Sequence, residues 1–157
     1  MEKIPMTING SKRLQDELQF LKTVERPSVI NAIAEARLHG DLSENAEYHA
    51  AKDRQGFIEG RIAELEEKLS RAEVIDVSKL SGSEITFGAT VTVVDEDTSE
   101  EHTYQIVGGD ESDIRKGLLS ITSPLARALI GKKVSDTVEV STPGGSKEYA
   151  VHRISYN

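Results

Sequence analysis

The spacing of apolar residues gives the first half of the chain the pattern of a helix with one apolar face. This pattern is interrupted once, at Pro27, a residue that lacks a backbone donor. The apolar residues at helical spacing are Leu14, Leu18 and Leu21 before the proline, and Ile30 and Ile33 after it. We therefore expect a helix that kinks or resets near Pro27.

A second helical pattern follows, in which apolar residues alternate steps of four and three. Its members are Ile58, Ile62, Leu65, Leu69 and Ala72. Such a heptad predicts a seam between two packed helices. Between the two patterns, Gly40 suits a helix C-terminus, and Asp41 with Glu44 matches a capping box that opens the second helix. A short link makes the helices antiparallel, and a first helix over residues 11–38 would be about 40 Å long.

In the second half the period changes to that of strands. β-branched and aromatic residues mostly alternate around Val91–Val93, His102–Val107, Val138–Val140 and Glu148–Val151. One short helix is well signalled, with Ser123 as N-cap, Pro124 in the first position and Gly131 as its stop. The sequence thus predicts an α+β protein: an antiparallel helical coiled-coil hairpin over residues 1–78, and a small antiparallel β-sheet domain with a short helix over residues 79–157.

Charge narrows the class of partner. The net charge is −8, and the acidity is spread evenly: residues 1–75 hold 11 basic and 14 acidic side chains, and residues 76–157 hold 8 and 13. A protein that holds nucleic acid unaided usually carries a basic face, because phosphate neutralisation supplies much of that affinity. Free DNA or RNA is therefore a poor main partner, and a protein partner fits better.

Several classes of site and location are disfavoured by composition. The chain has no cysteine, which excludes disulfides and thiolate sites, and its four histidines are too scattered for a resident transition-metal site. The apolar runs are far shorter than the roughly 18 residues that span a bilayer, and no secretory signal is visible. We expect a cytoplasmic protein with no membrane partner.

Asp41 and Glu44 are the candidate chemical groups. Carboxylates three residues apart at a helix start point the same way, and Glu35 and Glu47 lie nearby in the sequence. Exposed carboxylates with a pKa of about 4 are ionised at neutral pH and bind hard cations. Mg²⁺ wants six oxygens, so two carboxylates make no tight site alone, but they can complete a site supplied by another enzyme and its substrate phosphates. From spacing alone, a capping box without further function explains the pair better.

A resemblance changes that balance. The most specific segment is His39-Gly40-Asp41-Leu42-Ser43-Glu44-Asn45-Ala46-Glu47-Tyr48. Further matching segments run along the chain: Ile4-Pro5-Met6-Thr7, Arg26-Pro27, Glu59-Gly60-Arg61-Ile62, Phe87-Gly88-Ala89-Thr90-Val91, Ser123-Pro124-Leu125-Ala126 and Thr142-Pro143-Gly144-Gly145. Together they resemble the Gre family of bacterial transcript-cleavage factors, and the GreA branch more than the GreB branch.

The resemblance implies a function, a partner and a metal. Gre factors insert their hairpin into the secondary channel of bacterial RNA polymerase, where the tip acids help to hold a second Mg²⁺. The polymerase then cleaves its own backtracked RNA, which rescues arrested complexes. By this resemblance, Asp41 and Glu44 take the catalytic and metal-sharing role. The protein would have no activity alone and would bind no cofactor when free.

The resemblance also implies binding residues. Arg37 and Lys52 correspond to a small basic patch that contacts the 3′ end of the nascent RNA, although a solvated face explains them equally well. The β-rich half resembles the FKBP-like domain that grips the polymerase, with Ser123, Pro124 and Leu125 expected at the contact. A good helix start explains these three residues without any contact.

Other functions remain as alternatives. The main one is a hairpin that plugs the polymerase channel and inhibits it without cleavage, although the intact Asp41/Glu44 pair favours cleavage. A coiled-coil adaptor would be insensitive to charge reversal at the tip. An independent nuclease would need more metal ligands than the tip supplies. We expect a monomer.

Overall fold

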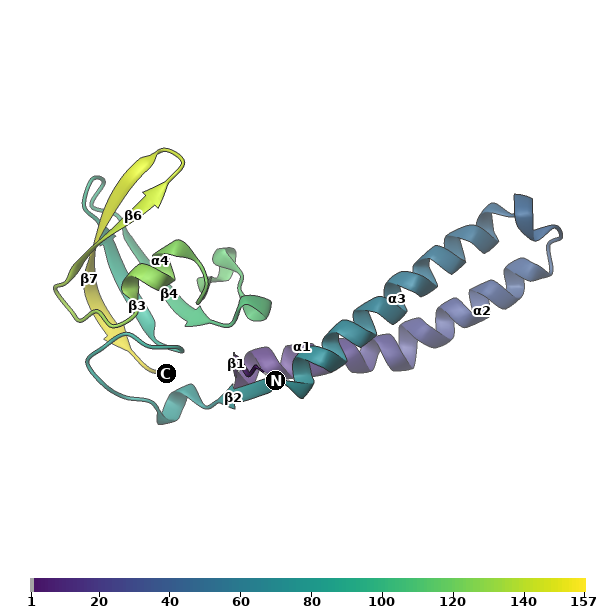
Figure 1. The fold of residues 1–157 in the computed structure, drawn as a ribbon, viewed down its shortest axis with the longest axis horizontal. Coiled ribbons are helices and arrows are strands. Elements are labelled where there is room, and N and C mark those ends of the chain that lie inside the picture. The colour runs from purple at the N-terminus through teal and green to yellow at the C-terminus, as the bar shows by residue number, and fades with distance from the viewer. Residues whose placement is uncertain (1) are drawn as a thin grey trace. The chain divides into compact units, whose positions relative to one another are not determined.

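The structure is a computed structural model that describes residues 2–157, and in it the chain divides into two compact units (Figure 1). The helical unit comprises Ser11–Ala72. The β-rich unit comprises Lys3–Gly10 and Glu73–Asn157. The predicted α+β class is confirmed. Among the described residues, no helix combines the length and the apolar character that crossing a membrane requires.

This division differs from the sequence-based boundary between residues 78 and 79, because the N-terminal segment joins the β-rich unit. Strand β1 (Ile4–Thr7) pairs with β2 (Ala72–Ile75) in a two-stranded sheet. The buried carboxylate of Glu111 accepts hydrogen bonds from the Thr7 N–H at 2.9 Å, from the Thr7 hydroxyl, and from the Gly108 N–H at 3.2 Å. The two bonds from Thr7 join residues 104 positions apart in the sequence, which no local pattern predicts.

The helical unit is an antiparallel hairpin. The first arm consists of α1 (Ile8–Phe20), a π-helical turn (Leu21–Glu25) and α2 (Arg26–Arg37), and the second arm is α3 (Ala46–Ser70). Figure 1 shows α2 and α3 side by side, joined by a short loop. The predicted reset near Pro27 is present as the π-helical turn, where the Arg26 N–H donates to the Leu21 carbonyl five residues back.

The π-helical turn corrects one predicted seam residue. Val29 is fully buried, whereas Ile30 is 52% exposed. A π turn inserts one residue into the helical repeat, so the buried stripe that passes through Leu21 resumes one position later than an uninterrupted helix would place it. The stripe therefore continues through Val29, Ile33 and Ala36.

The predicted heptad of the second arm is confirmed at its centre. Ile58, Ile62 and Leu65 are 2%, 2% and 0% exposed. Leu69, at the end of the arm, and Ala72, which belongs to β2, are only half-buried. The seam is thus best sealed along the middle of the hairpin.

Two glycines inside α3 offer a stability prediction. A Cβ built on Gly56 or Gly60 meets no atom within 4 Å. Glycine in a helix interior costs about 0.5–1 kcal/mol relative to alanine, mainly through the freedom of the unfolded backbone. Gly56→Ala and Gly60→Ala are each expected to raise the free energy of unfolding by that amount, measured by urea denaturation with circular dichroism.

Gly10→Ala is the contrasting variant. Its Cβ would collide with the Glu111 carboxylate, and the Thr7 and Gly108 donors hold that carboxylate in place. Forcing an atom into such a site typically costs about 1–3 kcal/mol. If Gly10→Ala stabilised the protein as the α3 variants do, the packing around Glu111 would be wrong.

The β-rich unit contains a five-stranded sheet in the order β5-β4-β3-β7-β6. The strands are β3 (Thr90–Asp95), β4 (Glu101–Val107), β5 (Leu118–Ser120), β6 (Thr137–Thr142) and β7 (Gly145–Ser155). Strands β3, β4, β6 and β7 occupy the four predicted segments, and the pairs β3–β4, β3–β7 and β6–β7 are antiparallel.

The predicted all-antiparallel sheet needs one correction, at the β5 edge. Strand β5 runs parallel to β4, from Gln105 opposite Leu118 to Val107 opposite Ser120. The chain between these strands makes two 3₁₀ turns and passes Gly117 at φ 75°, which brings it back in the same direction. A three-residue strand is too short to show a period in the sequence.

The core of the β-rich unit lies between the sheet and the helix α4 (Pro124–Leu129). Ala126 and Leu129 of α4 are fully buried together with sheet residues such as Val91 and Val93. The predicted helix start is confirmed, because the Ser123 side chain accepts from the Ala126 N–H and Pro124 occupies the first turn.

Candidate functional site

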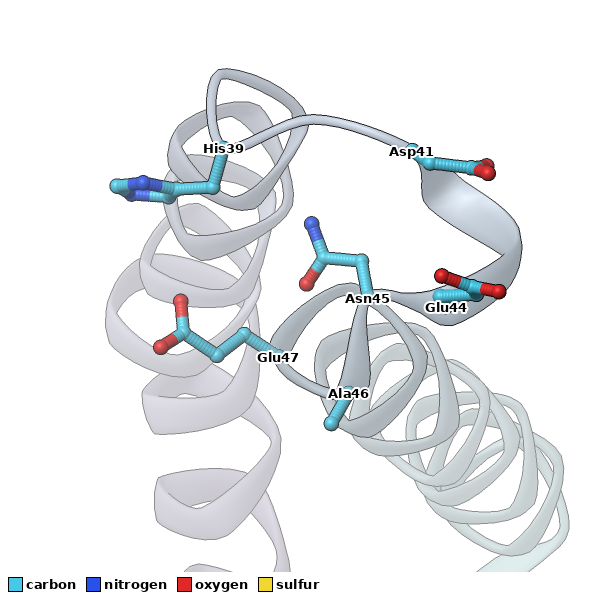
Figure 2. A pocket seen from close by; sticks show the side chains of 6 residues that line it. All are labelled: His39, Asp41, Glu44, Asn45, Ala46 and Glu47. Carbon is cyan, nitrogen blue, oxygen red and sulfur yellow. The ribbon is translucent and has the colours of Figure 1, made fainter.

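The tip of the hairpin is a short acidic loop held between two helix ends. α2 ends at Arg37 with Leu38 as its C-cap, and Gly40 follows at φ 118°, a conformation that favours glycine. Leu42–Glu44 then form one 3₁₀ turn before α3 begins at Ala46. The loop side chains line an open hollow made by His39, Asp41, Glu44, Asn45, Ala46 and Glu47 (Figure 2).

The capping of this loop differs from the predicted capping box. The Asp41 side chain caps the 3₁₀ turn, accepting from the Ser43 N–H at 3.0 Å and from the Ser43 hydroxyl at 2.9 Å. Asn45, and not Asp41, caps α3, accepting from the Tyr48 N–H at 3.0 Å. Five residues between Gly40 and α3 leave room for an extra turn, so the cap lies four positions later than the spacing predicts.

Glu44 therefore has no capping role. Within residues 2–157, no hydrogen bond or ion pair to its carboxylate is found. The interpretation of the pair as a capping box, which spacing alone favoured, is wrong for this side chain.

Asp41 and Glu44 lie on one side of the loop. In Figure 2 both carboxylates lie at the 3₁₀ turn on the same side of the loop, whereas Glu47 projects to the opposite side, from the first turn of α3. Side chains three residues apart line up in a 3₁₀ turn, because that helix has three residues per turn. The predicted alignment of the two acids is therefore present, although a different helix type produces it.

Both acids suit a hard cation. The Ser43 N–H, and after it the Ser43 hydroxyl, hold the pKa of Asp41 below its ordinary value. Asp41 is thus ionised throughout the neutral range, with its second oxygen free of these bonds. Among the described residues, no group of three or more histidine or acidic side chains gathers closely enough to hold a metal ion. The pair is a partial ligand set.

The lowered pKa of Asp41 can be tested through Ser43. Ser43→Ala removes the hydroxyl donor and keeps the backbone donor, so the pKa of Asp41 is expected to rise part of the way to its ordinary value. Because the folded pKa is depressed, the Asp41–Ser43 bonds stabilise the turn above the ordinary aspartate pKa. That stabilisation is lost as pH falls through the folded value. Carboxyl NMR titration measures both values.

The chain supplies a matched control. Asp76 accepts from the Ser78 N–H at 3.1 Å and from the Ser78 hydroxyl at 2.6 Å, in the same arrangement. The Ser78 hydroxyl is the main cause of a lowered pKa at Asp76. Ser78→Ala should raise the pKa of Asp76 and leave Asp41 unchanged. A shift of Asp41 in that variant would contradict a local cause.

Arg37 and Lys52 share one side of the hairpin near the tip. The Arg37 guanidinium carbon lies 5.9 Å from the centre of the Tyr48 ring, a cation–π distance. Lys52 follows Tyr48 by four residues on α3 and so lies on the same face, where its amino group donates to the Gln55 side chain at 3.2 Å. Both cations are exposed. Their contact with RNA remains a prediction.

Ser123, Pro124 and Leu125 form the start of α4 in the β-rich unit. Pro124 is exposed, whereas Ser123 and Leu125 are half-buried. The capping bond accounts for Ser123, and the apolar core accounts for much of Leu125. Their role in binding a partner also remains a prediction.

The sequence analysis assigned no role to Asn45, Tyr48 or His49. Asn45 caps α3 and also donates to the Ala36 carbonyl. The Tyr48 ring makes the cation–π contact with Arg37. The His49 Nε2 lies 3.2 Å from the Ser43 carbonyl oxygen. One signal was available: asparagine is among the best N-cap residues, and Asn45 directly precedes a helical run.

Comparison with known proteins bears on both units. Residues 4–74 match the family model described as transcription elongation factor, N-terminal, and residues 80–156 match transcription elongation factor, GreA/GreB, C-term. The chain is 65% identical over 156 residues to transcription elongation factor GreA of Phenylobacterium zucineum, with 99% of each chain covered. It is 64% identical over 156 residues to the GreA factor of Rhodospirillum rubrum, again with 99% of each chain covered.

Similar solved structures include GreA factor homolog 1 of Thermus thermophilus, at 28% identity and a TM-score of 0.45, covering 98% of this chain and 99% of that one. A GreA/GreB factor from Nitrosomonas europaea has 24% identity and a TM-score of 0.43, covering 98% and 100%. The assignment rests on the sequence matches, which span both units. On that basis the chain belongs to the GreA/GreB family of transcription elongation factors.

Proposed function

We propose that this transcription elongation factor binds bacterial RNA polymerase, inserts its hairpin tip into the secondary channel and stimulates cleavage of backtracked nascent RNA. The observation that carries the proposal is that the exposed carboxylates of Asp41 and Glu44 lie on one side of the tip (Figure 2), with the pKa of Asp41 held below its ordinary value. The family of the chain supports the polymerase as partner.

The acid pair supports a shared metal site. Mg²⁺ commonly takes one or two protein carboxylates and fills its other positions with water and substrate phosphates. Asp41 and Glu44 fit that partial role, because neither forms an ion pair within residues 2–157 and both are exposed. In a two-metal hydrolysis, the ion supplies a nucleophilic water and stabilises the charge on the phosphate. The tip residues would hold and orient the ion, and the polymerase would supply its remaining ligands.

The hairpin holds the tip at the end of two long helices that are paired along their length. α3 has 25 residues, which corresponds to roughly 38 Å at 1.5 Å per residue. Ion pairs join the two arms at four levels: Lys22–Glu66, Arg26–Glu59, Arg54–Glu25 and Arg61–Glu17. Exposed pairs are worth at most about 1 kcal/mol each, so the buried seam supplies most of the stability and the pairs mainly fix the register.

The remaining predicted residues fit this function as proposals. Arg37 and Lys52, exposed on one side near the tip, would attract the phosphates of the RNA 3′ end. The start of α4 at Ser123, Pro124 and Leu125 would contact the polymerase. The protein would act as a monomer and would cleave no RNA without the polymerase, since its own ligand set is incomplete.

The alternative of a channel-plugging inhibitor is less well supported. Such a factor has no need for two aligned, unpaired acids at its tip, and holding like charges together is unfavourable unless a cation joins them.

The test uses a halted, backtracked elongation complex with 3′-labelled RNA and Mg²⁺. The wild-type protein and the Asp41→Ala/Glu44→Ala double variant are compared for release of short labelled fragments. Competition against a labelled Gre factor gives the affinity for polymerase. Fast release with the wild type alone, at equal affinity, is the expected result. Binding without release by the wild-type protein would instead identify an inhibitor.

A further inference from the structure

Asn45 joins the two arms of the hairpin at the level of the tip. Its side-chain oxygen accepts from the Tyr48 N–H at 3.0 Å, in the first turn of α3. Its side-chain nitrogen donates to the Ala36 carbonyl at 2.7 Å, in the last turn of α2. One partner is a donor and the other an acceptor, so the orientation of the amide group is fixed by chemistry.

The backbone of Asn45 closes the turn that carries the acids. The Asn45 N–H donates to the Leu42 carbonyl at 3.4 Å, at the end of the 3₁₀ turn that Asp41 caps. Glu44 is the residue directly before it. A residue anchored to both arms through its side chain therefore also fixes the last residue of the acid turn.

Apolar packing does little to hold this loop. Leu38 is 83% exposed and Leu42 is 36% exposed. The bonds between Asp41 and Ser43 are internal to the turn, so they fix its shape but not its place on the hairpin. Two contacts tie the turn to the helices: the His49 Nε2 lies 3.2 Å from the Ser43 carbonyl oxygen on the α3 side, and the Asn45 bridge reaches Ala36 of α2 across the loop.

We propose that Asn45 is a positioning residue for cleavage: by bridging Ala36 and Tyr48, it sets where Asp41 and Glu44 stand relative to the hairpin axis. The proposal rests on the function proposed above. A misplacement of about 1 Å in a catalytic group can cost a hundredfold in rate, so loss of the bridge has a kinetic consequence.

Two substitutions separate the bridge from the cap. Asn45→Ser keeps a good N-cap oxygen but is too short to reach the Ala36 carbonyl. Asn45→Asp also keeps the cap, but it places an acceptor against the Ala36 carbonyl where the donor stood. Both variants should retain α3 and its melting temperature. Asn31→Ser is the matched control, because Asn31 is an exposed asparagine of α2 whose side chain, within residues 2–157, reaches only Glu35, at 3.5 Å.

The experiment measures fragment release from the backtracked complex across a range of factor and Mg²⁺ concentrations. For both Asn45 variants, the maximal rate at saturating factor is expected to fall roughly tenfold or more. The factor concentration for half-maximal rate should stay unchanged, and the Mg²⁺ requirement should rise. Asn31→Ser should behave as wild type. A wild-type maximal rate and Mg²⁺ requirement in both Asn45 variants would overturn the proposal.

A measurement on the free protein keeps this proposal separate from the proposed function. The backbone N–H at position 45, which donates to the Leu42 carbonyl, is present in every variant, and its hydrogen exchange reports by NMR on the junction between the turn and α3. Faster exchange at position 45 in both variants, after correction for each residue's intrinsic rate, is expected, and unchanged exchange would overturn the positioning role. If the wild-type protein released no RNA, the cleavage function would fail, and the exchange data would still decide whether Asn45 places the turn.

Discussion

Replacing Leu65 with alanine is expected to lower the free energy of unfolding by about 2–5 kcal/mol, the usual cost of removing a buried leucine side chain. Leu65 is 0% exposed and lies in the α3 seam, one turn from Ile62. The lost atoms forfeit their transfer free energy, and the arms cannot close over the gap without breaking the register that the ion pairs fix. Urea denaturation followed at 222 nm, where the helices dominate, measures the change.

Phe57→Ala is the control for the Leu65 variant. Phe57 lies on the same helix and has a larger side chain, but it is 74% exposed. Its removal should change the stability by about 0.5 kcal/mol or less, as for most surface substitutions. Equal losses in the two variants would show that the buried face of α3 has been assigned incorrectly.

The seam shows what periodicity can and cannot predict. In α3, which is uninterrupted, the heptad located Ile58, Ile62 and Leu65 correctly. In the first arm the same method placed Ile30 in the buried stripe, whereas Val29 is the buried residue. The sequence shows that Pro27 disturbs the helix, but it does not show whether the helical repeat gains or loses a residue there. The structure shows that a π-helical turn adds one residue to the repeat, which the sequence alone does not reveal.

The tip shows a similar limit. The sequence identified Asp41 and Glu44 as a pair on one side of the tip, and Figure 2 shows them on the same side of the loop. The reason was wrong, since a capping box at the start of α3 was expected and a separate 3₁₀ turn with its own cap is present. Asp41 and Asn45 are both strong caps, and spacing alone does not say which one the helix uses.

The β-rich unit was predictable where strands alternate and unpredictable where contacts are distant. Four of the sheet strands follow from β-branched runs, but the parallel edge strand β5 has only three residues. The bonds between Glu111 and Thr7 draw the N-terminal segment into this unit, and a buried glutamate carries no local signal of its partner. The domain boundary was therefore the feature least open to sequence reasoning.

Asp41→Asn and Glu44→Gln are each expected to reduce stimulated cleavage roughly 100-fold or more, because a charged ligand worth several kcal/mol is lost from the metal site. Both changes keep the size of the side chain. The asparagine oxygen still accepts from the Ser43 N–H, so the turn keeps its shape, and Glu44 makes no bond within the described residues that glutamine would break. Binding to polymerase, measured by competition, should be unchanged.

Glu47→Gln is the decisive comparison, because it removes the same charge from the same loop region. Figure 2 shows its carboxylate projecting away from the Asp41/Glu44 pair, so it is poorly placed to share their cation. We expect stimulated cleavage to fall by less than about threefold, because the substitution only lowers the negative charge of the tip by one. A loss as large as that of Glu44→Gln would mean that the total negative charge of the tip matters, and not the alignment of two carboxylates. In that case the 3₁₀ turn that aligns Asp41 with Glu44 would have only a structural role.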